Sequence, residues 1–187
     1  MNTGDHGWFA LTAKHQHEGS VTRMLAAKGV SVFHPTYTVV RRWKDRNKSL
    51  QMPLFPGYVF FTGGLDRRVE ILSTPGVFSI VSFGETAAEI SGEEIEAIRR
   101  AVVNEMPLNP HPFLVEGDRV RVLRGPLAGV SGILHRHRDV SRLILSIELL
   151  GRSAAVEIDS SVVERISGPQ QRLGYQSWTE QAWNLSN

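Results

Sequence analysis

The spacing of apolar residues divides the chain into two stretches with different patterns. Up to about residue 105, short apolar runs typical of strands alternate with segments whose apolar residues recur every three or four positions, as in helices. This interleaving predicts an α+β sandwich for residues 6–105, in which an antiparallel sheet is flanked by helices. We expect helices over 18–28, 65–72 and 95–102, and strands over 8–13, 30–33, 36–43, 57–62 and 77–83.

The third helix is preceded by a start signal. Ser91-Gly92-Glu93-Glu94 is a capping-box sequence, in which the side chains of Ser91 and Glu94 can each bond the backbone N–H of the other residue. The sequence therefore predicts that Glu94 bonds back to the start of its own helix.

Three prolines between positions 107 and 112 favour an extended segment and forbid a helix there. We interpret residues 106–113 as a linker between two domains. After it, a small closed β-barrel is predicted for residues 114–167, and we expect this segment to fold alone. Residues 168–187 are polar and rich in glutamine, and we expect a mobile tail. The barrel strands are expected over 120–122, 132–134, 142–150 and 154–158.

Composition indicates the size of the domains and the cellular compartment of the protein. The chain has 187 residues, of which 41% are hydrophobic, so two small domains can each bury a core. It has no cysteine, which excludes disulfides and zinc–thiolate sites and fits a reducing cytoplasm. No signal-peptide pattern is found, and no segment approaches the roughly 20 apolar residues that span a bilayer. We therefore expect a cytoplasmic protein without membrane contact.

An aromatic strand is the strongest candidate for a binding surface. Along Tyr58-Val59-Phe60-Phe61, Tyr58 and Phe60 share one face and the other two residues share the opposite face. One interpretation buries both faces under helices. The other leaves Tyr58 and Phe60, with Phe83 from a nearby strand, as an exposed apolar patch of the kind that marks partner sites.

A basic segment follows the strand expected over 36–43. Residues 41–48 contain five basic side chains and one acidic side chain, and they lie between two predicted strands. Such a hairpin can be a solvated tip, or it can contact phosphates while Trp43 stacks on an unpaired base. In the second interpretation the nucleic-acid-binding residues are Lys14, Arg23, Arg41, Arg42, Trp43 and Lys44.

Catalytic and metal-binding motifs are not found. Two His-x-His pairs occur, at positions 15 and 17 and at 135 and 137, but no nearby residue completes a set of three or four ligands. The glycine-rich segment 125–132 lacks the Lys-Ser/Thr of a phosphate-binding loop. We expect neither a metal nor a cofactor, and we expect a binding protein and not an enzyme.

Three motifs, in their order, resemble the NusG family of bacterial transcription elongation factors. Trp8-Phe9-Ala10-Leu11 and Phe55-Pro56-Gly57-Tyr58 resemble the N-terminal (NGN) domain of that family, and Gly117-Asp118-Arg119-Val120 with Gly125-Pro126-Leu127-Ala128-Gly129 resembles its C-terminal KOW domain. The resemblance covers nearly all of residues 7–166. It implies that the predicted barrel is of the SH3-like KOW type.

The resemblance also implies partners. Through the N-terminal domain, such a factor binds the clamp helices of the largest RNA polymerase subunit, and the matching residues here are Trp8, Tyr58, Phe60 and Phe83. Lys14 matches a residue that contacts non-template DNA in the RfaH branch of the family. In NusG the KOW barrel meets Rho or a small-subunit ribosomal protein, and the matching positions here are Leu127, Leu149, Leu150 and Arg152.

Three functions remain open within this interpretation. The basic, Trp-containing segment leading into Pro53-Leu54-Phe55-Pro56 resembles the specialised UpxY-type and RfaH-type antiterminators, which act on selected operons. The first alternative is a general housekeeping NusG. The second is an RNA-binding KOW protein of ribosomal type, a class that lacks an α+β domain before its barrel.

Overall fold

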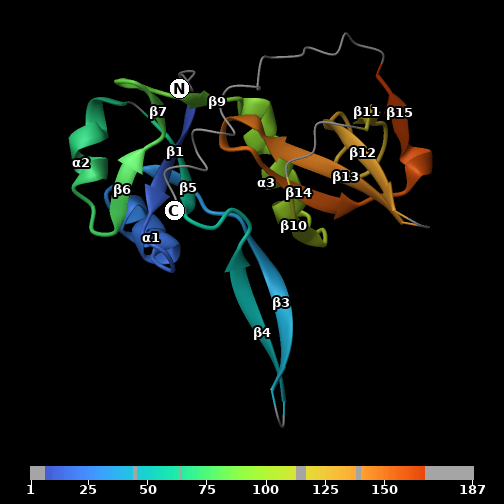
Figure 1. The fold of residues 1–187 in the computed structure, drawn as a ribbon, viewed down its shortest axis with the longest axis horizontal. Helices are drawn as coiled ribbons and strands as arrows, with labels where there is room; N and C mark the ends of the chain where they lie inside the picture. The colour runs from blue at the N-terminus through green and yellow to red at the C-terminus, as the bar shows by residue number, and fades with distance from the viewer. Residues whose placement is uncertain (1–6, 44–45, 64, 113–116, 138–139, 167–187) are drawn as a thin grey trace, which may run out of the picture.

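The computed structural model describes residues 7–43, 46–63, 65–112, 117–137 and 140–166. An N-terminal unit of strands and helices and a C-terminal unit dominated by strands lie side by side, with helix α3 between them (Figure 1). The predicted α+β class is confirmed. Residues 168–187, for which we expect a mobile tail, lie outside the described residues.

The N-terminal sheet is antiparallel and has the strand order β2-β5-β1-β6, with β9 also pairing with β1. Apolar residues on one of its faces pack against α1 and α2, in a cluster that includes Leu11, Leu25, Phe61 and Ile71. The elements are β1 (Trp8–Ala13), α1 (Glu18–Ala27), β2 (Ser31–Phe33), β5 (Tyr58–Thr62), the 3-10 turn η1 (Leu65–Arg67), α2 (Arg68–Leu72), β6 (Val77–Ile80) and β9 (Glu89–Ile90).

A buried carboxylate fixes the turn that leads into β5. Glu18, the first residue of α1, is only 3% exposed, and its Oε1 atom accepts a hydrogen bond of 2.8 Å from the backbone N–H of Gly57. Gly57 has a φ of 82°, a conformation that favours glycine. An acidic group at the start of a helix also interacts favourably with the helix dipole. The start of the aromatic strand is therefore held by α1.

A two-stranded ribbon projects from the body of the protein (Figure 1). It consists of β3 (Thr36–Trp43) and β4 (Arg46–Pro53), paired in one continuous register from Thr36 opposite Pro53 to Trp43 opposite Arg46. The sequence predicted β3 but not β4, because the segment 46–53 is mostly polar and lacks apolar alternation. Two further short strands, β7 (Ser82–Phe83) and β8 (Thr86–Ala87), pair with each other near the N-terminal sheet.

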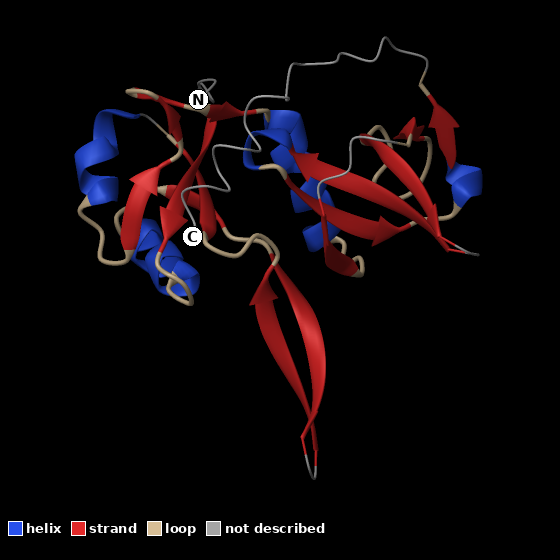
Figure 2. Ribbon diagram, in the orientation of Figure 1, coloured by secondary structure: helices blue, strands red, loops and turns tan. Residues whose placement is uncertain are grey.

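The strands of the C-terminal unit form one six-stranded antiparallel sheet, in the order β10-β14-β13-β12-β11-β15 (Figure 2). Its long central strands β12, β13 and β14 overlap the strands expected from the sequence, but β13 ends at Ile147 and residues 148–150, expected in that strand, form a 3-10 turn. The elements are β10 (Leu108–Pro112), β11 (Asp118–Val122), β12 (Ser131–His137), β13 (Val140–Ile147), the 3-10 turn η2 (Glu148–Leu150), β14 (Arg152–Glu157), the 3-10 turn η3 (Ser160–Val162) and β15 (Val163–Arg165).

Most of the segment interpreted as a linker is a strand of this sheet. Residues 108–112 form β10, which pairs with β14 from Leu108 opposite Val156 to Pro112 opposite Arg152. The segment is extended, as the prolines predicted. Because β10 is an edge strand, its prolines are tolerated where they would disrupt a central strand. The chain between the two units is thus incorporated into the barrel sheet.

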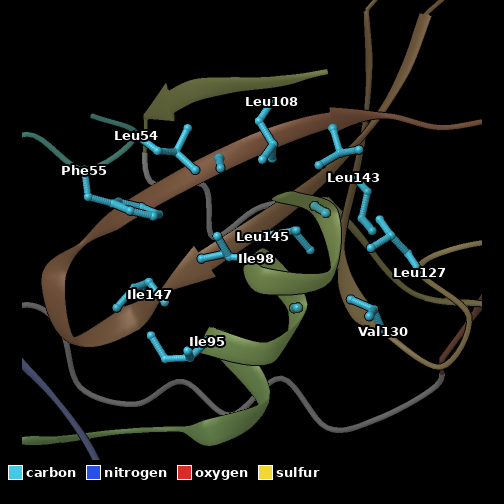
Figure 3. Close-up of a cluster of buried hydrophobic side chains, with 14 of the residues drawn as sticks. Leu54, Phe55, Ile95, Ile98, Leu108, Leu127, Val130, Leu143, Leu145 and Ile147 are labelled. Carbon is cyan, nitrogen blue, oxygen red and sulfur yellow. The ribbon is translucent and has the colours of Figure 1, made fainter. Parts of the chain in front are cut away.

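Helix α3 (Gly92–Val103) joins the two units into one core. A single cluster of buried apolar side chains runs from the N-terminal sheet through α3 into the barrel (Figure 3). Ile95 and Ile98 of α3 lie close to Leu145 and Ile147 of β13 (Figure 3), and Phe55 belongs to the same cluster. We call this arrangement docked.

The predicted capping box does not form. Ser91 makes no side-chain bond to the helix start, and the Oε1 atom of Glu94 accepts the backbone N–H of Glu148 at 3.1 Å. The prediction was wrong because docking turns Glu94 toward the barrel, where another N–H group needs an acceptor. Among the described residues, no helix is long and apolar enough to cross a membrane.

Candidate interaction surfaces

Phe60 lies at the centre of the aromatic face and is fully buried. β5 runs between β1 and β2, and the Phe60 ring lies 6.2 Å from that of Phe33 and 5.6 Å from that of Phe55, centroid to centroid. Of the two interpretations of this strand, the one that buries Phe60 therefore describes the docked arrangement. The physical reason is that Phe33 and Phe55 pack against its ring, in a core cluster that continues into α3 and the barrel.

Two further aromatic residues form the rim of this core. Trp8 and Tyr58 are partly buried and pack against the same cluster, and Trp8 meets Phe33 edge to face at 6.4 Å. Phe83 differs, because it lies on β7, is 59% exposed and is not a member of the cluster. The structure thus brings together Trp8, Tyr58 and Phe60 and leaves Phe83 apart from them.

The barrel residues predicted to bind a partner fall into three environments. Leu149 and Leu150, in the η2 turn, are partly buried against the cluster that contains Phe60. Leu127 is 1% exposed, so in the docked arrangement it is a core residue and not part of the surface. Arg152 is exposed at the start of β14. The two leucines of η2 therefore contribute to the docked interface itself.

Polar contacts flank this apolar interface. The Nη2 atom of Arg100 on α3 donates a hydrogen bond of 2.7 Å to the carbonyl of Pro126, and Glu94 accepts the N–H of Glu148. Burial raises the pKa of Glu94 to about 6; the N–H of Glu148 opposes this shift, and the Glu148 carboxylate adds to it. The interface therefore holds one carboxyl group whose charged form is disfavoured by docking.

The predicted nucleic-acid-binding residues lie on separate elements. Lys14 directly follows β1 and Arg23 lies on α1, and both are exposed. The backbones of Arg41, Arg42 and Trp43 form the last three positions of β3. Lys44 lies outside the described residues. Thr12, near the end of β1, pairs with Tyr58 at the start of β5. Lys14 therefore leaves the sheet at the same end of the strands at which the chain enters β5 from the β3–β4 ribbon.

Sequence reasoning missed several residues that shape these surfaces. Phe33 and Phe55 complete the aromatic cluster, and Ile95 and Ile98 cover it from α3. The apolar spacing of α3 indicated a buried face but not which surface covers it. Among the described residues, no group of three His, Cys, Asp or Glu side chains is placed to hold a metal ion.

An α+β unit with an aromatic strand, followed by a small barrel that contains a Gly-Pro turn, defines a protein of the NGN and KOW type. Comparison with known proteins agrees. Residues 6–99 match the family described as "Transcription termination factor nusG". The NusG of Campylobacter jejuni is 27% identical over 173 residues, covering 86% of this chain and 98% of that protein. The NusG of Escherichia coli K12 is 31% identical over 140 residues, covering 72% of this chain and 77% of that one.

Both relatives are described as transcription termination/antitermination proteins. Among solved structures, Thermotoga maritima NusG, described under the heading of domain interaction, is 24% identical with a TM-score of 0.49, and the match covers 87% of this chain and 98% of that one. The chain belongs to the NusG family of transcription termination and antitermination factors.

Proposed function

We propose that this protein is a cytoplasmic transcription elongation and antitermination factor without enzymatic activity. In this proposal its N-terminal unit binds the clamp helices of the largest RNA polymerase subunit through Trp8, Tyr58, Phe60 and Phe83. Its barrel recruits a second partner, Rho or a small-subunit ribosomal protein, through Leu149, Leu150 and Arg152. The family membership and the aromatic strand support the polymerase contact.

One observation carries the mechanism: the two proposed partner surfaces lie in one core. Phe60 is fully buried, while Leu149 and Leu150 of the barrel pack against the cluster that contains it. The docked chain therefore covers Phe60 completely and Leu149 and Leu150 in part, while Phe83 and Arg152 stay exposed. Polymerase contact through Phe60 requires α3 and the barrel to separate from β5, and the free energy of that separation lowers the apparent affinity.

The test compares two leucine-to-glutamate changes in the full chain. Leu150→Glu places a charge in the docked interface, whereas Leu123→Glu changes a barrel residue that is 50% exposed and outside the cluster. We expect Leu150→Glu to bind a fragment containing the polymerase clamp helices more tightly than wild type, and Leu123→Glu to bind like wild type. Calorimetric titration measures both, and equal affinities in all three proteins would contradict the mechanism.

The aromatic contact is tested in the opened protein. Phe60→Ala is a poor probe, because removing a fully buried ring costs about 3–5 kcal/mol of stability. Tyr58 is only partly buried, so Tyr58→Ala combined with Leu150→Glu leaves the core more intact. We expect this change to weaken clamp binding by about 2 kcal/mol, as central aromatic anchors do. Unchanged affinity in a folded double variant would show that the polymerase surface lies elsewhere.

We also propose that the protein contacts the non-template DNA strand in the elongation complex through Lys14, Arg23 and the ribbon residues Arg41, Arg42, Trp43 and Lys44. Charge density and the projecting geometry of the ribbon support this contact. The contact is mainly to phosphates, so it positions the factor more than it reads sequence.

Restriction to selected operons is part of the proposal. The covered polymerase surface supports it, because a factor that must first be opened engages only those complexes that open it. Deleting the gene and sequencing nascent RNA tests this point. We expect a limited set of long operons to lose distal transcripts while growth continues. Genome-wide changes in pausing, or lethality, would favour the housekeeping alternative instead.

A further inference from the structure

The β3–β4 ribbon has two unlike faces, as follows from its register. In an antiparallel pair, residues opposite each other share a face, and the faces alternate along each strand. One face, which we call the Trp face, carries Tyr37 opposite Met52, Val39 opposite Leu50, Arg41 opposite Lys48 and Trp43 opposite Arg46. The other, which we call the Thr face, carries Thr36 opposite Pro53, Thr38 opposite Gln51, Val40 opposite Ser49 and Arg42 opposite Asn47.

The polar groups at the base of the Thr face already bond one another. The hydroxyl of Thr36 donates to Oε1 of Gln51 at 3.1 Å, and Nε2 of Gln51 donates to the hydroxyl of Thr38 at 2.9 Å. Val40, next on this face, is 62% exposed. Among the described pairs of this face, the basic position is 42.

The Trp face combines a partly covered apolar base with a basic end. Tyr37 packs against the core cluster, and Val39 and Leu50 are partly buried. Beyond them, the register places basic residues at positions 41, 46 and 48 of this face and a tryptophan at position 43. Cations alternating with an aromatic residue suit a single-stranded nucleic acid, whose phosphates meet the charges while an unpaired base stacks on the ring.

The ribbon is anchored so that these faces keep a fixed direction. Its two strands continue toward the paired strands β2 and β5, and the N–H of Leu54 donates to the carbonyl of Pro35 at 2.9 Å across the base. Leu54 and Phe55, directly after β4, are each 2% exposed in the core cluster. A ribbon of eight residue pairs, rising about 3.3 Å per residue, extends roughly 25 Å from this anchor.

We propose that the ribbon binds single-stranded nucleic acid with the Trp face alone, so that Arg41 contacts the strand and the neighbouring Arg42 does not. The proposal rests on the proposed nucleic-acid contact and narrows it to one side of the ribbon, so that Arg42 leaves the set of contacting residues named above. It assigns different roles to two adjacent arginines that have the same charge.

The experiment uses this pair as its own control. Full-length wild type, Arg41→Ala and Arg42→Ala are titrated with a fluorescent single-stranded DNA of about 20 thymidines over a range of salt concentrations. Each lost phosphate contact lowers the slope of log K against log salt by about 0.7 for single strands. We expect this loss in Arg41→Ala and an unchanged slope in Arg42→Ala. Equal losses in both variants, or no loss in either, would overturn the one-sided contact.

Trp43→Ala tests the stacking. Loss of one stacked base is worth about 1 kcal/mol or more, so the affinity should fall at least about fivefold with an unchanged salt slope. Tighter binding of wild type to a duplex than to the single strand would overturn the single-stranded assignment. Circular dichroism confirms that each variant is folded. Clamp-helix binding measured on the same proteins separates this test from the proposed polymerase contact, since Arg41→Ala should leave that binding unchanged.

Discussion

Among individual residues, Glu18 has the clearest structural role. Its carboxylate is almost fully buried at the start of α1 and accepts a hydrogen bond from the N–H of Gly57, in the turn that leads into β5. One side chain of the first helix thereby fixes where the aromatic strand begins. The sequence motif Phe-Pro-Gly-Tyr suggested a turn at this place but not its partner, which lies 39 positions earlier in the chain.

We predict that Glu18→Ala lowers the free energy of unfolding by about 1–3 kcal/mol, because it leaves the partly buried N–H of Gly57 without its acceptor. Urea unfolding followed by tryptophan fluorescence measures the change. Glu96→Ala is the matched control, since Glu96 is exposed on α3, and it should stay within about 0.5 kcal/mol of wild type. A similar small effect for Glu18→Ala would mean that the turn holds without its anchor.

At the scale of elements, the spacing of apolar residues predicted those helices and strands whose own sequence specifies them. Apolar periodicity located β1, α1, β5 and α3 within a few residues of their observed bounds. It failed where pairing came from elsewhere in the chain. β4 has little apolar alternation and is a strand because β3 lies beside it, and β10 contains two prolines and is a strand because β14 offers an edge.

For the candidate surfaces too, the sequence predicted local features but not tertiary contacts. The sequence identified the aromatic face of β5 and the leucines of η2 as apolar surfaces. It could not indicate that they share one core, because nothing in the local pattern of either segment specifies what covers it. Tertiary packing decided that Phe60 and Leu127 are buried.

The contributions of α3 and β10 change what we expect of an isolated barrel. Ile95, Ile98 and Leu108 are buried in the cluster that contains Leu143 and Leu145. Fully burying an aliphatic side chain is worth about 1.5–3 kcal/mol, so the three together approach the whole stability of a small domain. We predict that a fragment of residues 92–167 unfolds cooperatively on heating, whereas residues 114–167 do not.

Circular dichroism and dispersion of amide proton signals distinguish these two fragments. The longer fragment should show both helix and strand, with well-dispersed signals. The shorter one should show poor dispersion and bind a dye that reports exposed apolar surface. A stable all-β fold of residues 114–167 alone would contradict the prediction, because it would show that the barrel does not need α3 or β10 for its stability.

For the molecule as a whole, docking is linked to pH through Glu94. The carboxyl group has a pKa of about 6 when docked, against an ordinary value of 4.5, so the docked state holds its proton more tightly. Below pH 4.5 the group is protonated in both states and has no effect on the equilibrium. As the pH rises through 6, docking buries a charge and is weakened. The protein should therefore be more open at pH 7.5 than at pH 5.

Energy transfer between dyes on the two units reports this opening. Wild type should lose transfer efficiency between pH 5 and 7.5. Glu94→Gln keeps an acceptor for the N–H of Glu148 but cannot ionise, so its efficiency should change much less over the same range. Glu96→Gln, on the exposed side of α3, should behave like wild type. A pH response that survives in Glu94→Gln would assign the titration to another group.

The core that spans both units also has a consequence during synthesis. The core cluster that contains Phe60 includes barrel residues that are translated only after α3 is complete. At about 5–20 residues per second, the roughly 60 residues between the end of α3 and the end of β15 take about 3–12 s to appear. For that interval the nascent chain carries a folded N-terminal sheet whose aromatic face has no barrel to cover it. Newly made chains therefore pass through a short period in which this apolar surface is accessible to chaperones, to other nascent chains and to polymerase.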